Sequence, residues 1–144
     1  MRDDDLGHLL PLMRGYCDFY GVAPDDAALL AMSRALIADS EREGVQLIAR
    51  TDEGAPVGFA TVFWSWSTLR AARVGVMNDL YVAPGARGSG LADELIGGCV
   101  EHCRRRADVA SLGWQTARDN HRAQAVYERV GATRSEWVDY SLPV

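Results

Sequence analysis

The chain is organised around residues 78–92, which read Asn78-Asp79-Leu80-Tyr81-Val82-Ala83-Pro84-Gly85-Ala86-Arg87-Gly88-Ser89-Gly90-Leu91-Ala92. The apolar run over 74–82 predicts a strand, and Pro84 and Gly85 end it. Apolar residues then recur at helical spacing over 91–103. Glycines in the turn allow close approach of a ligand, and the first N–H groups of a helix have no partner within the helix. The stretch therefore predicts a phosphate-binding turn that opens a helix.

The spacing of this turn separates it from two other phosphate loops. The chain contains no G-x-x-x-x-G-K-[ST] and no G-x-G-x-x-G after a first strand, which excludes a nucleoside-triphosphate loop and a dinucleotide fingerprint. The turn instead reads Arg87-x-x-Gly90-x-Ala92 after Leu80-Tyr81-Val82. In this it resembles the coenzyme A pyrophosphate loop of the GCN5-related N-acetyltransferase (GNAT) family. The simpler alternative is a glycine turn that starts an ordinary helix.

A second motif follows one predicted strand later and reads Asn120-x-x-Ala123-x-x-x-Tyr127-x-x-x-Gly131-Ala132. Its residues and position resemble the same family. The wording of 78–82 and the Gly131-Ala132 ending look most like the branch that acts on polyamines and similar small amines. The alternative from the residues alone is that Asn120 caps a helix and that Tyr127, which lies on an apolar face, packs in the core.

The resemblance implies the α/β fold of the GNAT family: four helices and a mixed central sheet of about six strands, with parallel strands that splay apart at the cofactor site. The strand–helix–strand order around the glycine turn independently predicts a parallel crossover. Members usually begin with a strand that this chain lacks, so either the sheet has one strand fewer or the sequence starts late. We expect a single domain over 1–144. Helices are predicted at 5–20, 25–40, 90–106 and 121–130. Strands are predicted at 45–50, 57–67, 74–82, 111–116 and 133–142, the last as a strand or hairpin.

Composition limits the class of protein. A chain of 144 residues with 48% hydrophobic and 24% charged residues is long and apolar enough for one globular domain. Its net charge of −5 argues against nucleic acid and anionic membranes as partners, and is weakly compatible with a cationic small molecule. The apolar runs are too short to span a bilayer and the N-terminus lacks a signal-peptide core, so we expect a cytoplasmic protein.

Cysteine and histidine usage points to no metal centre. The three cysteines lie in apolar helical patterns, which predicts buried free thiols in a reducing compartment. The three histidines are scattered, so no ligand cluster is expected.

The resemblance also implies acetyl-CoA as co-substrate and gives roles to particular residues. Tyr127 would protonate the departing thiolate, and the backbone N–H of Leu80 would stabilise the oxyanion. Many members carry a glutamate on the third strand that acts as the general base. The matching residue here is Asn78, which cannot accept a proton. Asp79 is therefore our candidate base, although neighbours on a strand point to opposite faces. The residues expected to bind the cofactor are Leu80, Tyr81, Val82, Arg87, Gly88, Ser89, Gly90, Leu91, Ala92, Asn120 and Tyr127.

The acceptor side is less marked in the sequence. Tyr20, Trp64, Trp66 and Asn78 are candidates for contact with the acceptor, and core packing or a dimer contact is the alternative for the tryptophans. We expect transfer of an acetyl group to a primary amine of a small molecule by direct attack on the thioester. The alternatives are a protein lysine or N-terminal acetyltransferase and a non-catalytic acetyl-CoA sensor. The family often forms dimers, and a homodimer here would use the Trp137 region or an uncovered sheet edge.

Overall fold

A computed structural model describes residues 1–143 of the chain. Its helical elements are η1 (Asp3–Asp5), α1 (Leu6–Phe19), α2 (Asp26–Ala38), η2 (Pro84–Ala86), α3 (Leu91–Arg104) and α4 (His121–Arg129). The strands are β1 (Gly44–Arg50), β2 (Pro56–Ser67), β3 (Ala72–Val82) and β4 (Val109–Gly113). The four predicted α-helices are confirmed, each with ends within two residues of the expected ones.

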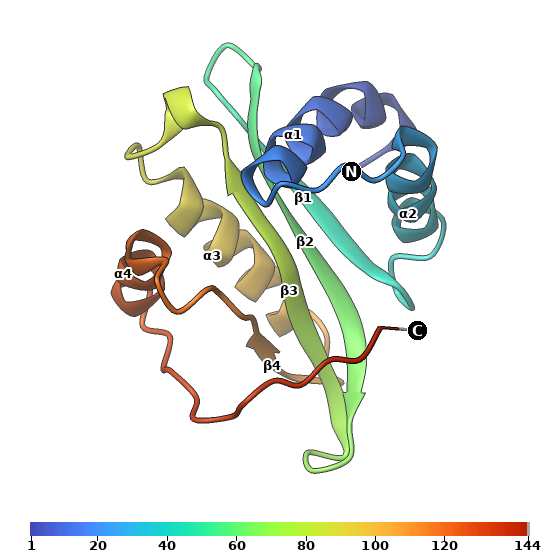
Figure 1. Ribbon diagram of the computed structural model, residues 1–144. Helices are drawn as coiled ribbons and strands as arrows, with labels where there is room; N and C mark the ends of the chain where they lie inside the picture. The colour runs from blue at the N-terminus through green and yellow to red at the C-terminus, as the bar shows by residue number, and fades with distance from the viewer. Residues whose placement is uncertain (144) are drawn as a thin grey trace.

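The strands form one mixed sheet in the order β1-β2-β3-β4. The first three are antiparallel neighbours, and β4 lies parallel to β3 because α3 carries the chain back across the sheet. Helices α1 and α2 cover one face of the sheet and α3 covers the other, with α4 beside β4 and α3 (Figure 1). Among the described residues no helix has the length and apolar character that a membrane crossing needs.

The expected sheet of about six strands is wrong, since the described residues form four. The predicted strand at 133–142 is absent and this segment has no regular structure. The apolar side chains of this segment are not buried, since Trp137 and Tyr140 are 82% and 93% exposed. A strand without a neighbouring strand leaves its N–H and C=O groups unpaired, so sequence pattern alone does not hold it. The last strand also ends earlier than predicted, at Gly113 rather than Thr116.

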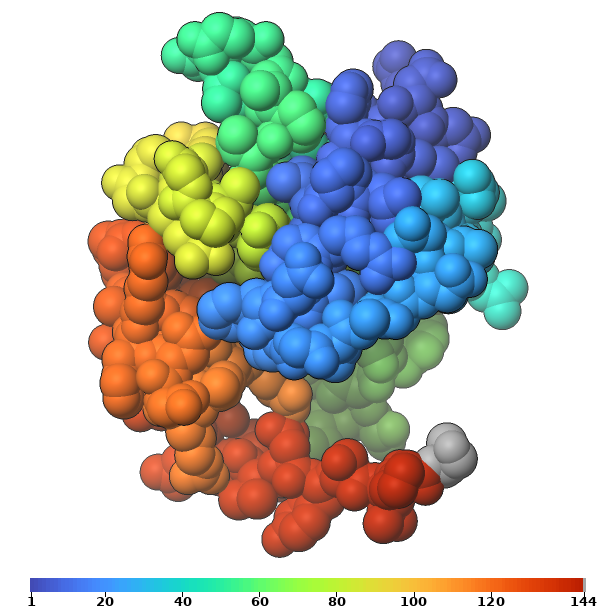
Figure 2. Space-filling model, turned by 45° about the horizontal axis from the view of Figure 1, so that its top comes forward, coloured from blue at the N-terminus to red at the C-terminus, as the bar shows by residue number. Residues whose placement is uncertain are grey.

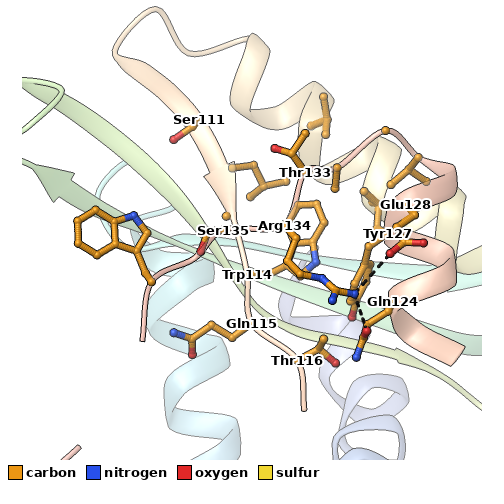
Figure 3. Close-up of a pocket in the computed structure, with 18 of the residues that line it drawn as sticks. Ser111, Trp114, Gln115, Thr116, Gln124, Tyr127, Glu128, Thr133, Arg134 and Ser135 are labelled. Carbon is orange, nitrogen blue, oxygen red and sulfur yellow. Dashed lines mark hydrogen bonds and ion pairs between the residues drawn. The ribbon is translucent and has the colours of Figure 1, made fainter. Parts of the chain in front are cut away.

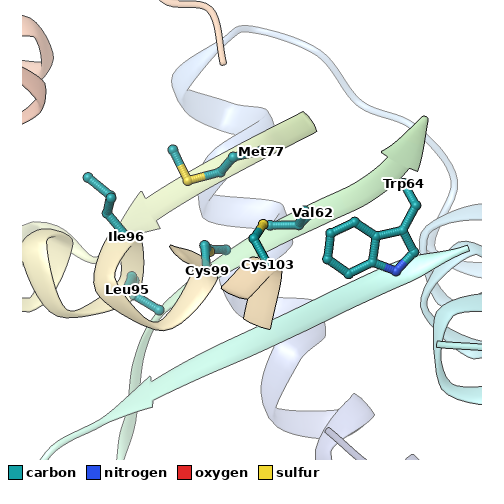
Figure 4. Packing of buried hydrophobic residues seen from close by; sticks show 8 residues of the cluster. Val62, Trp64, Met77, Leu95, Ile96, Cys99 and Cys103 are labelled. Atoms are coloured by element: carbon teal, nitrogen blue, oxygen red, sulfur yellow. The ribbon is translucent and has the colours of Figure 1, made fainter. Parts of the chain in front are cut away.

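Two apolar cores hold the layers together. Val62, Met77, Ile96 and Cys99 pack between the sheet and α3, as Figure 4 shows. Leu6, Leu9, Leu12, Met13 and Phe59 form the core under α1 and α2. All three cysteines are buried free thiols, as the sequence predicts, and burial raises the pKa of Cys99 to about 12.

A β-bulge in β3 decides which side chains reach which core. Thr61 pairs with Asp79 and Val62 pairs with Met77, so Asn78 is an extra residue on β3. On either side of it, Met77 and Leu80 both face α3. Asp79 consequently points to the face that α1 covers, where the Tyr16 hydroxyl lies within hydrogen-bonding reach of its carboxyl group.

Candidate functional site

The glycine turn between β3 and α3 has the backbone that its sequence predicts. Gly88 and Gly90 have φ values of 88° and 90°, a region that L side chains rarely adopt, and no atom lies within 4 Å of where a Cβ would stand. Two side chains fold back onto the turn: Arg87 Nε donates to the Val82 carbonyl at 2.9 Å, and Ser89 Oγ donates to the Ala86 carbonyl at 2.7 Å. The turn is therefore braced from within, and its backbone is left open to a ligand.

The turn offers a run of free donors. Within residues 1–143, the backbone N–H groups from Gly88 to Asp93 donate to no protein acceptor. The positive end of the α3 dipole lies at the same place. Such an arrangement suits a phosphate group. Asp93, an acidic residue in this first turn, is paired with Arg129 of α4 at 2.7 Å, which lowers the pKa of the Asp93 carboxyl group.

In the part of the chain that the structure describes, no strand lies beside the edge of β3 next to the turn. The last pair between β3 and β4 is Val76 with Gly113, whereas β3 continues to Val82. Leu80, Tyr81 and Val82 pair with β2 on their other side. An extended ligand can therefore lie along this part of β3, which is where the sequence places the cofactor-binding backbone groups.

Tyr127 lies on α4 and is half-buried, with its ring edge-on to Trp114 at a centroid distance of 5.3 Å. Burial raises the pKa of the Tyr127 hydroxyl, a hydrogen bond with Thr116 lowers it, and the nearby Tyr20 raises it again. Asn120 starts this helix, because its Oδ1 accepts from the backbone N–H of Ala123 at 3.2 Å. The capping interpretation of Asn120 is therefore confirmed, and its contact with a cofactor stays a prediction.

Asp79 is nearly buried on the α1 side of the sheet. Asn78 Nδ2 donates to its Oδ1 at 3.1 Å. Burial raises the pKa of the Asp79 carboxyl group, and the hydrogen-bond donors of Thr61, Asn78 and Tyr16 lower it by less. A carboxylate with a raised pKa is a stronger base, which suits proton transfer.

Tyr16 is the site residue that the sequence did not single out as a candidate. Its hydroxyl donates to the Asn78 carbonyl at 3.4 Å and lies beside the Asp79 carboxylate. Burial, followed by the charge of Asp79, raises the pKa of this phenol and keeps it protonated. Tyr16 lies on α1 and Tyr20 caps its end four residues later, and this spacing was the signal available in the sequence.

The end of α1 joins Asp79 to the α4 side of the site. The ring centroids of Tyr16 and Tyr20 lie 5.0 Å apart in an edge-on arrangement. The pKa of the Tyr127 hydroxyl is raised by burial and, less strongly, by the charge of Tyr20. The end of α1 (blue), the glycine turn (yellow) and the region around α4 (orange) meet on one face of the molecule (Figure 2). Asp79, Tyr16 and Tyr20 therefore lie together at the end of α1, although β3 and α1 are distant in sequence.

The two candidate tryptophans lie elsewhere. Trp66 pairs with Arg73, and Ala60 pairs with Leu80, so both tryptophans are at the far end of the β2–β3 pair from the site. Trp64 is in the α3 core, where its Nε1 donates to the Ser40 carbonyl at 2.9 Å. Trp66 is 70% exposed, with the Arg73 guanidinium 5.0 Å from its ring. Of the alternatives for Trp64, core packing is what the structure shows.

An open cavity of about 1160 Å³ lies next to the site. It is bounded by α3, β4, α4 and residues 130–139, and Tyr127 and Trp114 line it (Figure 3). Arg134 crosses its wall and pairs with Gln124 and Glu128 at 2.7 and 3.5 Å. No residue of the glycine turn lines this cavity, so the cavity and the turn are separate features. The described residues contain no group of three or more potential metal ligands.

Comparison with known proteins shows the family of the chain. Residues 11–132 match the acetyltransferase (GNAT) family. The chain is 28% identical to "Uncharacterized N-acetyltransferase YhfO" of Bacillus subtilis, over 99% of this chain and 94% of that protein. It is 36% identical to "D-amino-acid N-acetyltransferase HPA3" of Saccharomyces cerevisiae, over 56% of this chain and 49% of that protein.

A solved structure described as a probable acetyltransferase has the same fold, with a TM-score of 0.86 and 30% identity over 100% of this chain and 95% of the other. The chain therefore belongs to the acetyltransferase (GNAT) family and is an N-acetyltransferase.

Proposed function

We propose that the protein moves the acetyl group of acetyl-CoA to a primary amine of a small molecule. The observation that carries this proposal is an edge of β3 beyond Val76 that has no neighbouring strand in the described residues, next to the glycine turn. Asp79 faces the α1 side of this strand, and Tyr127 packs with the cluster on its α3 side. The relative named for D-amino acids supports a small acceptor, because the substrate in its name is a small molecule with an amine.

GNAT acetyltransferases use acetyl-CoA, and the residues present here fit it. The free N–H groups that begin at Gly88 match a pyrophosphate, which needs several donors aimed at one place. Leu80, Tyr81 and Val82 would hold the pantetheine arm along the edge of β3, with the N–H of Leu80 toward the thioester oxygen. Splaying of β4 from β3 would supply the space for this arm.

The chemistry requires two proton transfers. The amine nitrogen attacks the thioester carbon, so a C–N bond forms and the C–S bond breaks. Asp79 accepts the proton that the amine loses, directly or through a water molecule. Tyr127 gives its proton to the departing thiolate, and solvent restores that proton. Burial keeps the Tyr127 hydroxyl protonated at neutral pH by raising its pKa.

The acceptor side suits a cationic amine. Asp79 supplies a carboxylate, and Tyr16 and Tyr20 supply aromatic rings beside it. A carboxylate and ring faces are both attractive to an ammonium group. Asn78 is exposed at the same place and is our fourth acceptor contact. A homodimer through the exposed Trp137 region also remains a proposal.

The test is acetyl transfer to a panel of polyamines, amino acids, aminoglycosides and lysine peptides, with products identified by mass spectrometry. We expect one class of small amine to gain a single acetyl group. Tyr127→Phe should bind acetyl-CoA normally and turn over about a hundredfold more slowly or worse, as loss of general-acid catalysis requires. Tyr140→Phe is the matched control, since Tyr140 is 93% exposed and is not among the residues that line the cavity beside Tyr127.

Two results would overturn the proposal. Acetylation of the lysine peptides alone would indicate a protein acetyltransferase. Binding of acetyl-CoA with no product from any amine would favour the non-catalytic sensor.

A further inference from the structure

A row of polar side chains crosses three strands on the sheet face that α1 and α2 cover. Gln46 of β1 pairs in register with Thr61 of β2, and Thr61 pairs with Asp79 of β3. Their exposed fractions are 3%, 0% and 9%. Buried polar groups are costly unless they bind one another, so three such residues in one row need an explanation beyond packing.

The hydrogen bonds in this row have a direction. Gln46 Nε2 donates to Thr61 Oγ1 at 3.1 Å. A hydroxyl that accepts still carries a hydrogen of its own, and the Asp79 carboxyl group faces it across the β2–β3 pair. An ionised carboxylate is a stronger acceptor than an amide oxygen. The hydrogen of Thr61 is therefore directed to Asp79.

We propose that Gln46 and Thr61 are positioning residues, which together hold the Asp79 carboxyl group in one orientation with an oxygen lone pair toward the acceptor amine. The role of Asp79 as the base rests on the proposed function, whereas the relay from Gln46 through Thr61 to Asp79 does not. Asn78 completes the arrangement, because its Nδ2 holds Oδ1 of the same carboxylate at 3.1 Å.

The relay has a consequence for the titration of Asp79. The groups that face this carboxylate are Thr61 from β2, Asn78 from its own strand and Tyr16 from α1, with Tyr20 behind Tyr16. Burial raises the pKa of Asp79, and among these donors Thr61 lowers it most. Removal of the Thr61 hydroxyl should therefore raise the pKa of Asp79 further.

The experiment compares Thr61→Val, Thr61→Ser and Gln46→Met in the full chain. The Asp79 carboxyl carbon is followed by NMR over pH, with its signal assigned by its loss in Asp79→Asn. The acidic limb of kcat/KM is measured with any amine that is acetylated. We expect both readouts to move to higher pH in Thr61→Val and to move less in Gln46→Met. At a pH on this acidic limb, kcat/KM of Thr61→Val should be about tenfold lower than that of the wild type, whereas Thr61→Ser should behave as the wild type.

An unchanged titration of Asp79 in folded Thr61→Val overturns the relay, because the Thr61 hydrogen would then go to a rotated Gln46 amide. If Thr61→Val does not fold, Gln46→Met decides the matter, and an Asp79 titration like that of the wild type overturns the relay. A shifted titration in a protein that acetylates no amine supports the relay and counts against the proposed function.

Discussion

Replacement of Gly90 by valine should separate cofactor binding from folding. Gly90 has a φ of 90°, where an L residue costs about 1–2 kcal/mol and a β-branched one is strongly disfavoured. A Cβ at this position would meet no atom within 4 Å, so strain of the backbone is the main cost. A loss of about 1–2 kcal/mol should lower Tm by roughly 2–8 °C and leave the protein folded.

The effect on acetyl-CoA should be larger than the effect on folding. A shift of the turn misdirects the N–H groups that would meet the pyrophosphate, and each bond to a charged group is worth about 1.5–3 kcal/mol. Loss of two of them costs about 3–6 kcal/mol, which weakens binding by more than a hundredfold.

The assay is isothermal titration calorimetry with acetyl-CoA, alongside circular dichroism to confirm the fold. Gly85→Val is the matched control, because Gly85 also has open space around it but lies outside the positive-φ positions of the turn. We expect Gly85→Val to bind within a few-fold of the wild type. If folded Gly90→Val binds acetyl-CoA as tightly as the wild type, the assignment of this turn to the pyrophosphate is refuted.

Three further predictions concern stability. Burial raises the pKa of Asp79 in the folded state, so its contribution to stability is favourable below the unfolded pKa and is lost as pH rises through the folded pKa. Asp79→Asn should therefore raise Tm at neutral pH, and this gain should vanish in acid. Scanning calorimetry over pH measures both. Asn120→Ala removes the cap of α4 and should cost about 1 kcal/mol in urea unfolding, with Asn120→Asp close to the wild type. Gly58→Ala would place its Cβ 2.7 Å from the Tyr81 carbonyl oxygen and should cost about 1–3 kcal/mol, and an unchanged midpoint would contradict the close packing of β2 and β3.

Local patterns predicted the helices and the glycine turn well, because each depends on contacts close in sequence. The apolar spacing of α3 is that of a helix, and the glycines at 88 and 90 allow the positive φ values that the turn needs. The motif at 120–132 also resembles the GNAT family, and the match to that family is confirmed.

The failures share one cause, which is dependence on a distant partner. The pattern at 133–142 is that of a strand, but no neighbouring strand pairs with it in the described chain. Trp64 and Trp66 share one face of β2 as expected, yet only the register with β3 shows that they lie away from Leu80. The contact of Tyr16 with Asn78 joins residues 62 positions apart, which no local pattern reveals.

The bulge at Asn78 makes β3 two half-strands of opposite phase. Before it, Gly75 and Met77 face α3; after it, the residues that do so are Leu80 and Val82. Regular alternation through Asn78 would turn Asp79 into the α3 core and expose Leu80 to the α1 side, and the bulge prevents this. Deletion of Asn78 would join Met77 directly to Asp79, in register with Val62 and Thr61, and both would keep their present faces. A deletion at position 78 therefore leaves the faces of β3 unchanged, whereas a one-residue insertion or deletion elsewhere in the strand would reverse them beyond that point.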